Sequence, residues 1–208
     1  MRFAMNWFNK KRKVSIEDQL IQLHRTGITL KINTPIENIL ERERREYERN
    51  PYIFLLMSMG SEYQAVENSL VHPSDDVWYL DRECIEDHGD YSRIVERIAG
   101  IVGNELDITN IYDVLNIEKN EAFISLVANG KVYKFIFHVE DDWLDMSIFM
   151  HMSKLLKERG SNKRFYHSII DQHVLIVFLS KEQWVDLNKL LNIFIPCYLG
   201  EGGEEEQK

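Results

Sequence analysis

The feature that most limits the possible folds is the dipeptide Asn129-Gly130, which lies between the apolar and β-branched runs AFISLVA and KVYKFIFHVE. Asn and Gly tolerate the two positive φ angles of a type I′ turn, so this pattern predicts a β-hairpin. Two further runs, KRFYHSII and HVLIVFLS, flank Asp171-Gln172 and predict a second hairpin. The chain is therefore expected to contain antiparallel strands.

Helical patterns separate and follow the two hairpins. Residues 143–158 have helical spacing and stop at Gly160, and KEQWVDLNKLL follows the N-cap residue Ser180. The predicted order over residues 120–192 is therefore ββαββα. Hairpins imply an antiparallel sheet, and long helices imply that one face of it is covered, so we predict an α+β domain with two layers.

The N-terminal part carries helix signals. A helix is predicted from Ser15 to Gly27, and a second one begins at Thr34-Pro35 and continues through the solvated, charged run ERERREYER. NPYIFLLMSMG fits either a short buried helix or a strand, and its apolar face favours a helix. We interpret residues 1–60 as a helical segment that either packs on the main sheet or forms a small subdomain.

The remaining segments complete the expected organisation. Residues 61–76 are polar and are predicted to form a loop or linker, whereas DVWYLD reads as a strand. A helix is expected from Tyr91 to about Gly103. Residues 77–199 are thus assigned to the α+β domain, and residues 200–208, GEGGEEEQK, to a disordered acidic tail.

The distribution of charge restricts the function. The 208-residue chain has a net charge of -9, and residues 75–145 contain 17 acidic against 6 basic residues. An acidic field repels phosphates, so nucleic-acid binding is disfavoured, and a basic protein partner or a divalent metal is favoured.

Two other features of the sequence predict where in the cell the protein is located. No apolar run approaches the roughly 20 residues of a membrane span, and the opening MRFAMNWFNKKRK does not have the order of a secretory signal. We therefore expect a cytoplasmic protein without membrane contact, in which Cys84 and Cys197 are reduced. The pattern predicts no oligomeric state.

The stretch DRECIEDHGDY gathers acids, a thiol and an imidazole around one glycine. It is typical of a turn before a helix, with Asp90 as the cap, and its surplus charge also suits a partner-binding loop. The alternative is a metal or acid–base site of a hydrolase, assisted by a sheet histidine. Its residues would be Glu83, Glu86, Asp87 and His88.

A second acidic stretch, VEDDWLD, precedes the helix predicted over residues 143–158. Asp141 or Asp142 would cap this helix, while Trp143 suits either an interface anchor or a lid on the core. We combine the two stretches into one predicted partner-binding surface. Its candidate residues are Glu86, Asp87, Asp90, Tyr91, Asp141, Asp142, Trp143 and Asp145.

Catalytic motifs do not emerge from the sequence. GxSxG, HExxH, a phosphate-binding glycine loop and a dinucleotide-binding fingerprint are all missing. His138, His167 and His173 lie in predicted strands, and they would form a zinc or general-base site only if the strand order brings them together. We therefore predict no catalytic residue and no cofactor.

Three segments within residues 77–192 together resemble bacterial immunity proteins, which neutralise the toxic domain of polymorphic or contact-dependent toxins. They are LDRECIEDHGDY, VEDDW and RFYHSIIDQHVLIVFLSKEQWVDLN. The resemblance implies tight blocking of a toxin surface, commonly that of a nuclease with a basic cleft. The helices of the first 60 residues and the basic run NKKRK depart from such a protein.

Overall fold

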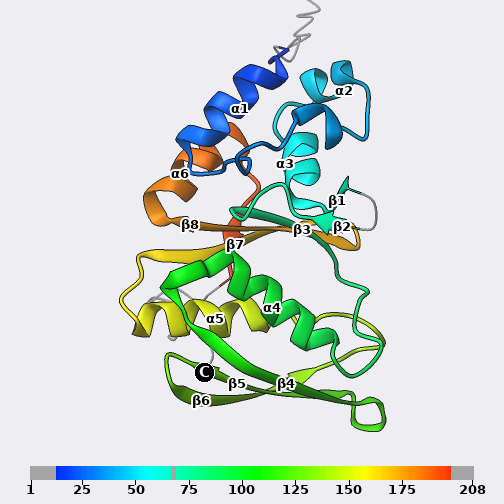
Figure 1. The fold of residues 1–208 in the computed structure, drawn as a ribbon, viewed down its shortest axis with the longest axis vertical. Coiled ribbons are helices and arrows are strands. Elements are labelled where there is room, and N and C mark those ends of the chain that lie inside the picture. Colours follow the sequence, from blue (N-terminus) through cyan, green and yellow to red (C-terminus); the bar gives the residue numbers. More distant parts are fainter. Residues whose placement is uncertain (1–12, 67–68, 198–208) are drawn as a thin grey trace, which may run out of the picture.

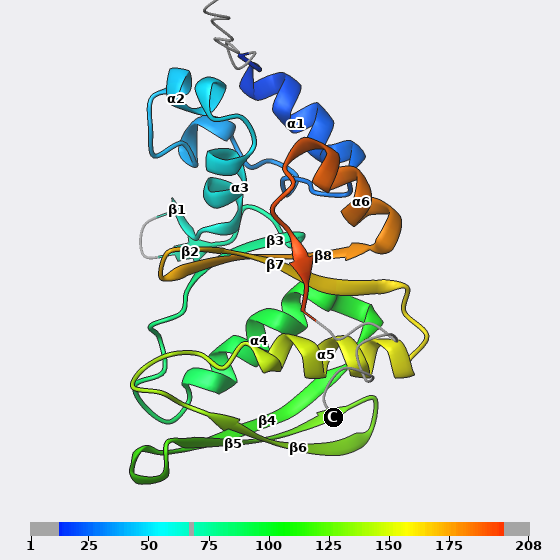
Figure 2. The ribbon, with the colours of Figure 1, turned by 180° about the vertical axis from the view of Figure 1, so that it is seen from behind.

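The structure, a computed structural model, describes residues 13–66 and 69–197 and consists of four stacked layers (Figures 1 and 2). The first layer holds helices α1 (Ile16–Arg25), α2 (Arg44–Arg49), α3 (Ile53–Gly60) and α6 (Lys181–Leu190). The third holds α4 (Asp90–Val102) and α5 (Ser147–Glu158). Each sheet is thus packed against the α4–α5 layer on one face.

The second and fourth layers are antiparallel sheets. The upper sheet has the order β3-β8-β7-β9, with β3 at Val77–Asp81, β8 at His173–Ser180, β7 at Lys163–Ile170 and β9 at Ile195–Pro196. The lower sheet has the order β4-β5-β6, with β4 at Ile108–Asn116, β5 at Glu121–Ala128 and β6 at Lys131–His138. The α+β class predicted from the sequence is confirmed.

Both predicted hairpins are present. Asn129 and Gly130 have φ angles of 49° and 77°, as a type I′ turn requires, and β7 pairs with β8 around Asp171. However, the hairpins belong to different sheets, and the expected two-layer arrangement is wrong. Helix α5, which connects the two hairpins, lies between the two sheets (Figure 2). The first hairpin therefore pairs with β4, and the second pairs with β3 and β9.

Strand β8 connects the two cores of the molecule. Its apolar residues alternate: Leu175, Val177 and Leu179 pack with the N-terminal helices. Val174, Ile176 and Phe178 pack with α4, α5 and the lower sheet. A strand buried on both faces reads as a continuous apolar run, which explains the sequence HVLIVFLS.

The N-terminal helices pack on the upper sheet, but the second of them differs from the prediction. Instead of one helix from Thr34-Pro35, a 3-10 turn η1 (Ile36–Asn38) is followed by a loop and the short α2. The loop folds back because Ile39 is buried and the Tyr47 hydroxyl accepts the N–H of Glu41 at 3.0 Å. Tertiary contacts therefore override the helical spacing of the charged run.

Two further expectations are corrected by the structure. Residues 61–76 include a small hairpin of β1 (Tyr63–Val66) and β2 (Ser69–Val71) rather than only a loop. Helix α5 begins at Ser147 and not at residue 143, and its first N–H groups are met by Asp145, whose Oδ1 accepts from Ser147 at 2.9 Å. Neither Asp141 nor Asp142 caps this helix. Short 3-10 turns, η2 (Gly103–Glu105) and η3 (Ile117–Lys119), flank β4.

The predicted acidic tail and most of the basic run NKKRK lie outside the described residues. Among the helices within residues 13–66 and 69–197, none combines the length and the apolar character that crossing a bilayer would require.

Candidate functional site

The two acidic stretches, residues 81–91 and 139–145 of the sequence, meet in space. The backbone carbonyl of Asp142 accepts the N–H groups of both Cys84 and Ile85 at 2.9 Å. Beside this contact, Glu83 and Trp143 form an antiparallel β-bridge. These backbone bonds fix the two stretches side by side, so their side chains form one surface.

A pocket of about 310 Å³ opens at this junction. Its walls include three buried apolar residues, Ile85, Leu115 and Val139. Polar groups complete the lining: Glu86 from the first acidic stretch, Asp141 and Asp142 from the second, and Asn120. The site therefore combines an apolar floor with carboxylates, at the small end of the volumes typical of ligand sites.

The carboxylates of this pocket are not neutralised by the protein's own cations. Within residues 13–66 and 69–197, no lysine or arginine forms an ion pair with Glu86, Asp141 or Asp142. Glu86 and Asp141 are exposed, and Asp142 is half-buried. Asp87 is also exposed, and its Oδ1 accepts the N–H of His88. We call Glu86, Asp87, Asp141 and Asp142 the acidic rim.

Three other predicted partner-binding residues, Asp90, Tyr91 and Asp145, are engaged in contacts within the protein. Asp90 is 6% exposed, and its Oδ2 accepts the N–H groups of Glu86 and Asp87 at 2.6 and 2.8 Å. Asp90 also pairs with Arg93, and Gly89 rather than Asp90 is the N-cap of α4. The carboxylate of Asp90 therefore shapes the loop that carries the acidic rim instead of facing a partner.

Tyr91 and Asp145 likewise have internal roles. The Tyr91 ring is 1% exposed and stacks on Phe137 with centroids 5.2 Å apart. Its hydroxyl accepts the N–H of Asp145 at 3.1 Å, and burial raises the pKa of this phenol. Asp145 accepts from the N–H groups of His138 and Ser147. The polar groups of both residues are therefore used by the fold itself.

Trp143 lies beside the acidic rim but is partly covered by the protein itself. The guanidinium of Arg82 sits 4.5 Å from the centroid of its ring, and Arg82 also donates to the carbonyl oxygens of Asp171 and Gln172. This cation–π contact fixes the indole in a half-buried position.

His88, the imidazole of DRECIEDHGDY, protects the edge of strand β4. Its Nδ1 accepts the N–H of Leu115 at 2.8 Å. Next to it, Asp113 on β4 accepts the N–H of Gly89 at 2.9 Å and a hydrogen bond from Ser92. Covering an edge in this way prevents unwanted strand pairing. His88 thus serves the fold through one ring nitrogen.

The predicted metal sites are not assembled in the part of the chain that the structure describes. No group of three or more His, Cys, Asp or Glu residues there is arranged to hold a metal ion, and this includes Glu83, Glu86, Asp87 and His88. The three sheet histidines are also apart: His138 ends β6 in the lower sheet, while His167 and His173 lie on β7 and β8 of the upper sheet.

His167 and Cys197, which no sequence motif connects, are in contact in the structure. The His167 Nδ1 lies 3.2 Å from the Cys197 Sγ. Burial raises the pKa of this thiol and lowers the pKa of the imidazole, so the neutral forms of both groups are favoured. A nucleophilic cysteine needs its thiolate form, which this environment disfavours. Cys84 is similar, since burial raises its pKa to about 12.

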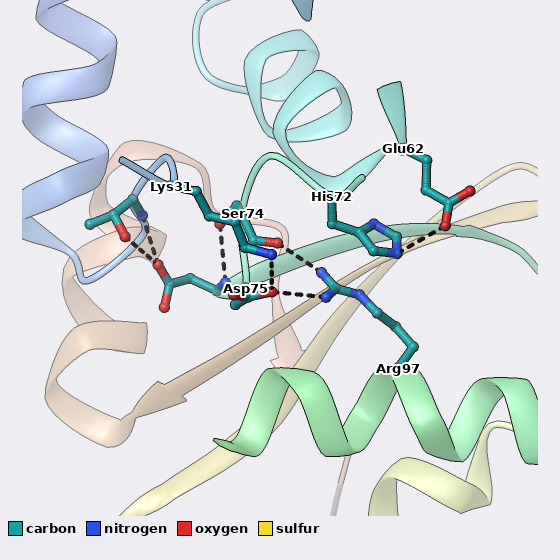
Figure 3. A network of polar contacts seen from close by, with 8 residues as sticks. Lys31, Glu62, His72, Ser74, Asp75 and Arg97 are labelled. Atoms are coloured by element: carbon teal, nitrogen blue, oxygen red, sulfur yellow. Dashed lines mark hydrogen bonds and ion pairs between the residues drawn. The ribbon is translucent and has the colours of Figure 1, made fainter. Parts of the chain in front are cut away.

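A second polar cluster connects the upper layers to α4 (Figure 3). Arg97 extends from α4 and donates to the carbonyl oxygen of Ser74 at 2.7 Å and to Asp75 Oδ1 at 2.9 Å. Lys31 bonds to the same carboxylate oxygen at 2.8 Å. Although burial raises the pKa of Asp75, the hydrogen bonds from Lys31 and Arg97 outweigh it and hold that pKa below its ordinary value.

His72 lies beside this cluster, with its Nε2 3.2 Å from Glu62 Oε1 (Figure 3). Burial, together with the nearby charges of Arg97 and Lys31, lowers the pKa of the imidazole to about 4. Because the charges of Lys31, Asp75 and Arg97 are paired with one another, we interpret the cluster as a structural clamp. The acidic rim, in contrast, offers its charges to the outside.

The apolar floor of the pocket was not identified in the sequence. Leu115 lies on β4, a strand that the sequence analysis did not predict, and Asn120 lies in the turn after it. The only signal for Val139 was its position directly before the acidic stretch. Comparison of the chain with protein-family models, curated proteins and solved structures finds no match.

Proposed function

We propose that this protein binds a basic protein partner through the acidic rim, and that it acts as an immunity protein which neutralises a toxin by covering its basic surface. One observation carries the proposal: carboxylates from two distant segments line one pocket without ion pairs to lysine or arginine in residues 13–66 and 69–197.

The composition of the pocket supports a cationic side chain as the group it receives. Lysine and arginine have long apolar stems and a charged end. Ile85 and Val139 offer apolar surface to such a stem, and Asp141 offers an acceptor for its charge at the mouth. Lysine and arginine are the side chains that can make both the apolar and the ionic contact at once.

Inhibition of a nuclease would follow from the same attraction between carboxylates and cationic side chains. A nuclease holds phosphates with lysine and arginine, and an acidic surface attracts these cations over a long range and speeds encounter. An inhibitor docked there excludes the substrate by occupying its site. The protein then needs no catalytic group of its own.

Charge reversal at the acidic rim tests the proposal. The probe is the C-terminal domain of the protein encoded directly upstream, which the immunity hypothesis identifies as the toxin. Replacing Glu86→Lys and Asp141→Lys together is expected to weaken its binding more than tenfold and to reduce the salt dependence of the Kd, because attraction becomes repulsion. Titration calorimetry at two salt concentrations measures both effects.

The matched control reverses two exposed acids away from the pocket, Glu96→Lys and Asp107→Lys, which changes the net charge equally. This variant is expected to retain the affinity and to protect cells that express the toxin. Equal binding by both double variants, or by the wild type and the rim variant, would contradict the proposed site.

A further inference from the structure

Strand β6 presents an open edge of the lower sheet. In the order β4-β5-β6 it pairs only with β5, in a regular register from Glu121↔His138 to Ala128↔Lys131. In a two-residue hairpin the residues beside the turn form a hydrogen-bonded pair, and the direction of bonding then alternates along the strand. The N–H and C=O groups of Val132, Lys134 and Ile136 therefore point away from β5.

These outward groups lack partners in the part of the chain that the structure describes. No backbone or side-chain group of residues 13–66 and 69–197 bonds to the N–H of Val132, Lys134 or Ile136. The next outward N–H, that of His138, is bonded to Asp145 Oδ2 at 3.2 Å. The free part of the edge is thus bounded by the turn at one end and by Asp145 at the other.

The opposite edge of the same sheet is treated differently. On β4, His88 accepts the N–H of Leu115, and the register shifts between Thr109 and Tyr112, where Asn110 has a φ of 51°. A bulge and a covering loop are two common ways to prevent strand addition. Strand β6 has neither a bulge nor a proline.

The side chains of β6 favour the addition of a strand. Val132 and Ile136 are 65% and 67% exposed on the outer face. On the inner face, Phe135 lies against His151 of α5, with ring centroids 4.7 Å apart, so the strand is held in place by this helix. A regular, open edge with two exposed apolar side chains on a fixed strand is a template for pairing with another chain.

We propose that β6 accepts an extended segment of another protein as an additional strand of the lower sheet, with a carboxylate of that segment opposite Lys134. This mode of recognition uses main-chain hydrogen bonds for affinity and alternate side chains for specificity. The charge of Lys134 argues for a different protein rather than a second copy. If β6 paired with β6 of a second copy in the longest antiparallel register, the two Lys134 side chains would lie opposite each other. Like charges directly opposite are destabilising.

A heptapeptide of sequence Thr-Val-Thr-Glu-Thr-Val-Thr, blocked at both ends, is the probe. Its glutamate can face Lys134 while its valines lie beside Val132 and Ile136. We expect it to protect the amides of these three residues from hydrogen exchange. It should bind roughly fivefold more tightly than the same peptide with lysine in place of glutamate, and Lys134→Glu should reverse this preference.

A proline variant separates strand addition from effects on folding. Ile136→Pro removes only an outward N–H, which proline tolerates on an edge strand, and it is expected to fold but to lose binding of the peptide. Ile136→Thr keeps the N–H and should retain binding. The Glu86→Lys, Asp141→Lys variant should also retain it, because the acidic rim is not used.

Three results would overturn the proposal. They are unchanged amide exchange at Val132, Lys134 and Ile136 in the presence of the glutamate peptide, equal peptide binding by a folded Ile136→Pro variant, and a dimer of the wild-type chain in sedimentation that Ile136→Pro converts to a monomer. The last result would identify a second copy of the chain as the occupant of the edge.

Discussion

Replacing Gly60 with alanine is expected to lower the free energy of unfolding by about 2 to 3 kcal/mol. Gly60 is the last residue of α3, and a Cβ atom there would lie 2.5 Å from the backbone N of Tyr79 and 2.9 Å from the carbonyl carbon of Trp78. Both atoms belong to the backbone of β3, which cannot yield without shifting the upper sheet. The clash would lift α3 from its contact with that sheet.

The same substitution at Gly100 provides the control. Gly100 is exposed in α4, and the nearest atom to an added Cβ is Arg97 Nη1 at 3.8 Å. Here alanine is expected to raise the free energy of unfolding by about 0.5 to 1 kcal/mol, because it favours the helix. Urea unfolding of both variants measures the difference. If Gly60→Ala is as stable as the wild type, the close approach of α3 to β3 is refuted.

The free energy of unfolding is expected to fall as the pH is lowered from 6.5 to 4, largely because of His72. In the folded protein, burial and the positive charges of Arg97 and Lys31 lower the pKa of this imidazole to about 4. The unfolded chain takes up the proton at a higher pH, so acid favours unfolding. The contribution is therefore complete above pH 6.5 and is lost towards pH 4, with a size on the order of 2 to 3 kcal/mol.

His72→Gln, which does not titrate, is expected to show a much flatter dependence on pH over this range. Some slope should remain, since burial also lowers the pKa values of His151 and His167. The control is His24→Gln, at an exposed position near the end of α1, which should follow the wild type. Urea unfolding at a series of pH values provides the measurement, and parallel curves for wild type and His72→Gln would contradict the assignment.

Local signals in the sequence predicted the elements that local interactions determine. The turn at Asn129-Gly130 needs only its own two residues, and the capping box of α6 needs only Ser180 and Gln183, three positions apart. Strand β4 was not predicted, because its bulge at Asn110 breaks the alternation and because Asp113 occupies a buried position where an apolar residue is expected.

The candidate site was predictable only in part, for the same reason. The acidic composition pointed to Glu86 and Asp141. Only the fold shows that the carboxylate of Asp90 already accepts backbone hydrogen bonds within the protein. Sheet partners depend on contacts between distant segments, so neither the separation of the two hairpins nor the meeting of the acidic stretches follows from periodicity.

The shared strand β8 has a consequence for any attempt to isolate the acidic rim. A shortened chain that lacked α1 to α3 would expose Leu175, Val177 and Leu179 to water, although the pocket itself would be complete. The N-terminal helices line no part of the pocket, yet the solubility of every fragment that contains it depends on them. The smallest useful fragment for binding studies therefore begins no later than α1.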